Sequence, residues 1–122
     1  MLSTIFGDKN KREAAQLNRD APAIIEQAEQ MHPVPSLHIM AKSITDLIER
    51  AHVQYGRQEI DLKRAHFDYR VFHKEARRKN DQIGLSTMTL VIIYIRAEIA
   101  GPPANPARAA IEAFMAKWHS SE

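Results

Sequence analysis

Four of the six histidines in this chain lie multiples of seven residues apart, which places them on one line of a coiled-coil-like helix: His38, His52, His66 and His73. Asp61 and Asp68 precede the last two of these histidines by five residues. In two parallel copies of such a helix, Asp61 of one copy faces His66 of the other, and Asp68 faces His73. A carboxylate neighbour favours protonated histidine, so the sequence predicts an interface that tightens on acidification. The alternative is that these histidines are merely solvated on the flank of the helix.

A second pattern concerns metal binding. Glu49 and His52 have the Glu-x-x-His spacing of carboxylate-bridged di-iron bundles, in which both side chains project from one helix face. A related segment 14 residues later has Lys63 in place of the glutamate. We therefore expect neither a metal site nor a cofactor. A metal-dependent bundle enzyme is kept as a distant alternative, and it would need acids from other helices.

A third pattern is basic. Residues 50–79 hold nine Lys or Arg against four Asp or Glu, whereas the whole chain has a net charge of only +2. We predict that this basic face makes binding contacts, through Arg57, Arg64, Arg70, Arg77 and Arg78. A row of cations on a helix can follow the phosphates of a nucleic acid, which is an alternative that the sequence does not favour. It can also contact an acidic protein, or simply solvate the helix.

Signs of catalysis are few. The chain has no cysteine, which excludes disulfides, thiolate metal sites and cysteine nucleophiles. Phosphate-binding glycine loops, the Gly-x-Ser-x-Gly elbow and the His-Glu-x-x-His motif are also absent from the sequence. We therefore predict that the protein is not an enzyme and has no catalytic residues.

The elements that position these residues follow from the prolines and the apolar spacing. Residues 36–79 contain no proline, and apolar residues recur there at intervals of three and four. This predicts one long helix with Gly56 as its weak point, and a kink or break at Gly56 is the alternative. One side carries a seam from Leu37 to Ala76. The opposite side of the helix is also apolar and consists of Ile39, Val53, Ile60 and Phe67. A helix that is apolar on two sides needs a packing partner on each side.

The remaining segments predict shorter helices. Residues 1–35 form short N-terminal helices, one of which has Pro22 in its first turn. Residues 86–100 form a buried helix that is apolar nearly all round. Residues 105–119 form an amphipathic C-terminal helix. The fold class is therefore an all-α bundle of about five helices around one long central helix, in a single domain spanning residues 1–122.

These patterns predict a protein that works through contact. We expect a non-enzymatic binding or regulatory module that acts through protein–protein interfaces as a homo-oligomer, with a homodimer as first choice. We expect it in the cytoplasm and not in a membrane, because the first residues lack the basic flank and apolar core of a signal peptide. No stretch approaches about 18 consecutive apolar residues.

Overall fold

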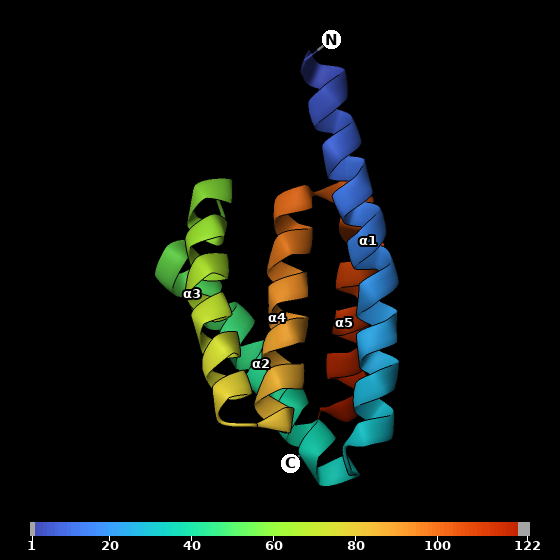
Figure 1. Ribbon diagram of the computed structural model, residues 1–122, viewed down its shortest axis with the longest axis vertical. Coiled ribbons are helices and arrows are strands. Elements are labelled where there is room, and N and C mark those ends of the chain that lie inside the picture. Colours follow the sequence, from blue (N-terminus) through green and yellow to red (C-terminus); the bar gives the residue numbers. More distant parts are fainter. Residues whose placement is uncertain (1, 120–122) are drawn as a thin grey trace.

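A computed structural model describes the backbone of residues 2–119 and the side chains of residues 10–119. Within these residues the chain forms five α-helices and one 3₁₀ turn, and no strand (Figure 1). The elements are α1 (Leu2–Met31), α2 (Val34–Tyr55), α3 (Glu59–Arg78), α4 (Gln82–Ala100), η1 (Pro102–Ala104) and α5 (Asn105–Trp118). The prediction of an all-α bundle is confirmed.

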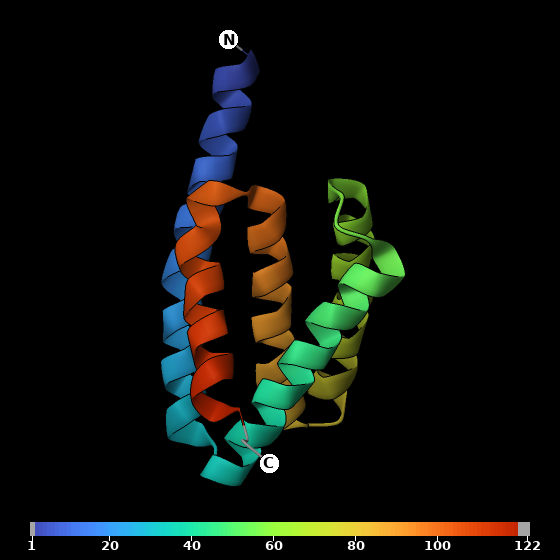
Figure 2. The same ribbon diagram turned by 180° about the vertical axis from the view of Figure 1, so that it is seen from behind.

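The centre of the bundle is α4, which contacts each of the other four α-helices. Helices α1 and α5 pack on one side of it and α3 on the other, while α2 runs diagonally from α5 to α3 (Figures 1 and 2). Leu90, Val91 and Ile95 have no exposed surface. By length and composition α4 is apolar enough to cross a membrane. In this structure most of its large apolar side chains pack at least partly against the surrounding helices.

The prediction of one long helix over residues 36–79 is wrong. The chain leaves the helical path at Gly56 and reverses, so that α2 and α3 are separate helices joined by residues 56–58 (Figure 2). The reversal lets both halves of the apolar seam pack on α4: Leu37, Ala41, Ile44, Ile48 and Ala51 are buried in α2, and Leu62, Ala65, Tyr69 and Ala76 in α3. Burial of the seam within one chain outweighs continuation of the helix. The central place therefore belongs to α4.

The predicted short N-terminal helices are in fact one 30-residue helix, α1. Pro22 lies inside it, with its ring exposed. The buried stripe formed by Ala14, Leu17, Ala21 and Ala28 passes this point without interruption. The free energy gained by packing that stripe offsets the cost of the backbone hydrogen bond that Pro22 cannot donate.

The predicted later helices are nearly correct in their bounds. The buried helix begins four residues earlier than expected, at Gln82, because the Asp81 carboxylate accepts a hydrogen bond from the backbone N–H of Gly84 at 2.9 Å. The C-terminal helix runs from Asn105 to Trp118, one residue shorter than expected.

Gly56 is expected to be essential for the reversal between α2 and α3. Its φ of +95° belongs to a region that only glycine adopts readily, and an added Cβ would lie 2.7 Å from a carboxylate oxygen of Asp61. Gly56→Ala should lower the free energy of unfolding by about 1–3 kcal/mol, measured by urea denaturation. Gly101→Ala is the matched control, because Gly101 has a φ of +85° and free space around it. A smaller loss for Gly56→Ala than for Gly101→Ala would contradict this account.

Candidate functional site

The apolar side of α2 and α3 that faces away from the bundle is uncovered by the described part of the chain. Its predicted members are all exposed, with exposed fractions of 57% for Ile39, 86% for Val53, 73% for Ile60 and 69% for Phe67. Val71 and Phe72 are also half exposed, at 52% each. The helix pair is therefore apolar on two sides, and the fold covers only one of them.

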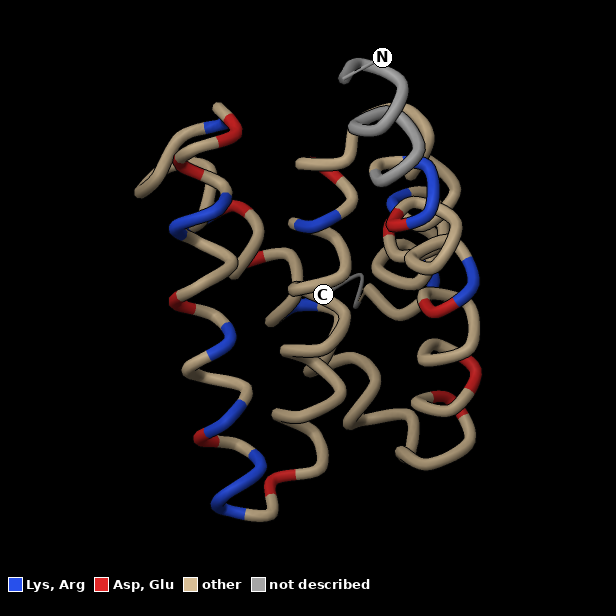
Figure 3. The backbone as a smooth tube through the Cα atoms, turned by 45° about the horizontal axis from the view of Figure 1, so that its top comes forward, with Lys and Arg blue, Asp and Glu red and all other residues tan. Residues whose placement is uncertain are grey.

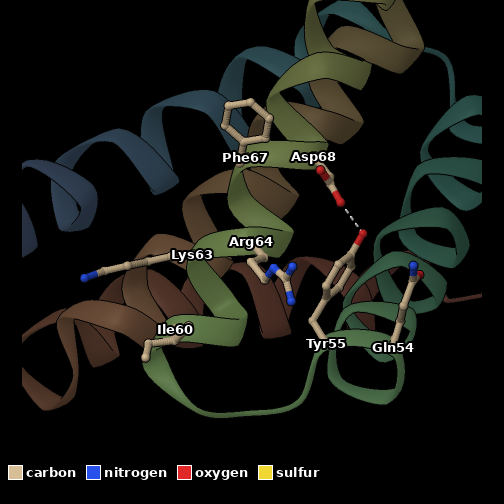
Figure 4. Close-up of a pocket in the computed structure, with 7 residues that line it drawn as sticks. All are labelled: Gln54, Tyr55, Ile60, Lys63, Arg64, Phe67 and Asp68. Atoms are coloured by element: carbon tan, nitrogen blue, oxygen red, sulfur yellow. Dashed lines mark hydrogen bonds between the residues drawn. The ribbon is translucent and has the colours of Figure 1, made fainter.

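The part of this surface nearest the α2–α3 turn is hollowed (Figure 4). The hollow has a volume of about 730 Å³ and is lined by Gln54, Tyr55, Ile60, Lys63, Arg64, Phe67 and Asp68. The Tyr55 hydroxyl donates a hydrogen bond to the Asp68 carboxylate across the hollow. This bond raises the pKa of Tyr55 above its usual value. The Asp68 carboxylate, which was predicted to face His73 of another copy, therefore already has a hydrogen-bond partner within its own chain.

The five arginines of the predicted basic face do not form one surface. Arg57 lies in the turn between the helices, and Arg64 lines the hollow beside Phe67. Arg78 donates to Glu75 at 2.6 Å. Arg70 and Arg77 line a different cleft. Basic residues recur along the whole of α3 (Figure 3), but the break at Gly56 and the turn of the helix divide them between separate sides.

That second cleft lies between α1, α3 and α4 and has a volume of about 710 Å³. From α3 it receives His66, Arg70, His73 and Arg77, which are spaced four, three and four residues apart and therefore share one helix face. The residues that complete it are Glu13, Asp20, Ile24, Lys74, Thr89, Ile92, Ile93 and Arg96.

The electrostatics of this cleft differ from those of the predicted acid–histidine interface. Burial lowers the pKa of His66, and Arg96 and Arg70 lower it further, although Glu13 acts in the opposite sense. Burial also lowers the pKa of His73, with smaller contributions from Arg77 and Arg70. Within one chain, both histidines therefore lie among cations. The pairing of Asp61 with His66 and of Asp68 with His73 between copies stays a prediction, although the continuous helix on which it rests is absent.

The Glu-x-x-His pair does not converge on a metal site. Glu49 is exposed, whereas His52 points into the bundle and lies 2.8 Å from a carboxylate oxygen of Glu98. Among the described residues, no three His, Asp or Glu side chains gather as metal ligands would.

The sequence analysis missed Glu98 and Arg96 as partners of the α2 and α3 side chains. A signal was present, because these are the only two charged residues in the apolar segment of α4. A charged residue in a buried helix requires a partner from another element. In the structure the Glu98 carboxylate is hydrogen-bonded to His52 Nε2. The Arg96 guanidinium forms an ion pair with Glu13, in which Arg96 Nη2 lies 3.0 Å from Glu13 Oε1.

No protein-family model matches the sequence, and no curated protein or solved structure matches it significantly. Within the described residues, α3 contributes to two surfaces: the outward apolar side and the basic cleft.

Proposed function

We propose that the protein is a helical binding module that acts through contact with protein surfaces, in the first place with a second copy of itself, and that it catalyses no reaction. One observation carries this proposal. Ile60, Phe67 and Val71 form an exposed apolar row along the outward side of α3. Their spacing of seven and four residues places them on one helix face.

The energetics of this row favour a covered state. Soluble monomers rarely expose contiguous large apolar side chains without a binding role. Burial of each such side chain is worth about 1.5–3 kcal/mol relative to full exposure. Phe67 lies at the centre of the row, between Ile60 and Val71, so it should contribute most to the contact.

The charges along α3 favour a second copy in antiparallel orientation. The first turn of the helix carries Glu59 and Asp61, and the last turn carries Arg77 and Arg78. Antiparallel contact between two copies places the acidic end of each helix beside the basic end of the other. Such a two-fold interface is self-complementary, as in most soluble homodimers.

The test is sedimentation over a range of concentrations with Phe67→Glu. This variant should dimerise at least tenfold more weakly, because a carboxylate would be buried at the centre of the interface. Val34→Glu is the matched control, since Val34 is 50% exposed at the start of α2. Circular dichroism checks that both variants remain helical. A wild-type protein that stays monomeric at all concentrations, or an equal effect of both variants, would overturn the proposal.

The pH dependence distinguishes the antiparallel arrangement from the parallel one. Only the parallel pairing predicted from the sequence brings Asp61 near His66 and Asp68 near His73 of the other copy, and it requires the side of α3 that carries these histidines, which here lines the cleft, to face that copy. Dimerisation that tightens between about pH 8 and about pH 6, across the ordinary titration of histidine, would favour parallel contact. Dimerisation without this change supports the antiparallel contact proposed here.

A further inference from the structure

We propose that the cleft between α1, α3 and α4 binds a small organic phosphate. The phosphate group would lie on the cationic face of α3, and the apolar body of the ligand would lie against the isoleucines that α1 and α4 contribute to the lining. The apolar side chains of the dimer contact, Ile60, Phe67 and Val71, do not line this cleft, and Arg77 is the residue that both proposals use.

The charge of the cleft suits a phosphate monoester. Its lining contains four Lys or Arg residues and two carboxylates, an excess of two positive charges while both histidines are neutral. A phosphate monoester carries about −1.5 to −2 charges at pH 7. Arg96 is held by Glu13 at 3.0 Å. Among the described side chains, no carboxylate lies within 4.0 Å of the charged groups of Arg70, Lys74 or Arg77.

The geometry of the donors is also suitable. Arg70 and Arg77 are separated by two turns of α3, and His73 lies between them on the same face. Arginine presents several N–H groups in a planar arrangement that matches phosphate oxygens. We expect Arg70 and Arg77 to approach one phosphate group from positions two turns apart on α3, with His73 between them.

Part of the lining of the cleft is apolar, which favours an organic ligand. Ile24 of α1 and Ile92 and Ile93 of α4 contribute to its lining. Its volume of about 710 Å³ lies within the usual range for small-molecule sites, about 300–1,000 Å³. An inorganic anion would use the cations and leave this apolar surface uncovered.

The two histidines couple binding to pH. His66 and His73 face Arg70, Lys74 and Arg77 of α3, Arg96 of α4, and Glu13 and Asp20 of α1. In the free protein, burial and the arginines lower the pKa of both histidines. A bound anion would raise these pKa values, so the complex takes up protons. Anion affinity should therefore rise as the pH falls through the titration of the free histidines, below about 6.5.

Phenyl phosphate is the probe for this site. Titration should give saturable shifts of the His66 and His73 ring signals in NMR spectra, with tighter binding than that of inorganic phosphate. Arg77→Gln should weaken binding roughly tenfold, because it removes a charge-assisted hydrogen bond. Arg64→Gln is the matched control, because Arg64 lies on the same helix but lines the outward hollow.

Several outcomes would overturn the proposal. One is the absence of saturable shifts at the two histidines; another is an equal loss of affinity in Arg77→Gln and Arg64→Gln. Tighter binding of inorganic phosphate than of phenyl phosphate would also contradict the apolar contact. A single-stranded oligonucleotide that binds more tightly than phenyl phosphate and depends equally on both arginines would identify a nucleic-acid surface instead.

Inorganic sulfate tests whether anion binding is coupled to protonation of the two histidines. The charge of sulfate does not change between about pH 8 and about pH 5.5, a range that includes the ordinary histidine pKa of about 6.5. Sulfate should bind more tightly at the lower pH in the wild-type protein. Replacing both histidines by glutamine should reduce this pH dependence while leaving some binding at the higher pH. Unchanged pH dependence in that variant would contradict the role given to His66 and His73.

Discussion

Replacing Ile95 by alanine is expected to lower the free energy of unfolding by about 2–5 kcal/mol. Ile95 has no exposed surface and lies in α4, the helix that all other α-helices contact. The substitution removes three buried carbon atoms and leaves a cavity that the surrounding helices can fill only in part. Urea denaturation followed by circular dichroism measures the loss.

Ile39→Ala is the control for this prediction. Ile39 is 57% exposed on α2, so the same substitution there should change the stability by no more than about 0.5 kcal/mol. Equal losses at the two positions would show that α4 is not the centre of the core. A large loss at Ile39 alone would mean that the outward side of α2 is covered in solution.

Replacing Glu98 by alanine is expected to cost about 1.5–3 kcal/mol of stability. The Glu98 carboxylate accepts hydrogen bonds from His52 Nε2 at 2.8 and 3.0 Å, and the two side chains are only 10% and 11% exposed. Removal of Glu98 leaves the buried imidazole without its partner. The double variant with His52→Ala should lose less than the sum of the two single losses, because it removes both members of the pair.

The exposed ion pair between Arg78 and Glu75 is the comparison for this prediction. Its atoms lie only 2.6 Å apart, but the side chains are 73% and 45% exposed. Water and salt screen such a pair, so Arg78→Ala should have a small effect. Additive losses in the His52 and Glu98 variants would contradict a direct contact between these two side chains.

Local sequence signals predicted much of the fold. The seam of α2 and α3, the apolar character of α4 and the amphipathic C-terminal helix followed from spacing and from the placement of proline and glycine. The errors occurred at Pro22 and Gly56. Pro22 was expected at the start of a helix but lies inside α1, and Gly56 was expected inside a helix but ends α2. In both cases the packing of a buried stripe decided between two locally acceptable conformations.

The candidate sites were predictable only in part. The residue types of the basic cleft were recognised, but His66 and His73 were assigned to an acid–histidine interface and Arg70 and Arg77 to a separate basic face. These four residues are spaced four, three and four positions apart along α3, a spacing that places them on one helix face. Glu13, Ile24 and Arg96 belong to helices far away in the sequence, so no local pattern could place them beside α3.

The sequence by itself determined that the chain is helical, most of the buried seam of α2 and α3, and that α2 and α3 have a second apolar side. These properties depend on the intrinsic preference of each residue and on its neighbours one or two turns away. The tertiary structure decided that the chain reverses at Gly56, that α4 is central, and that a basic cleft forms between α1, α3 and α4. These features depend on contacts between distant segments, because the free energy gained by burying both halves of the seam on α4 exceeds that of extending one helix.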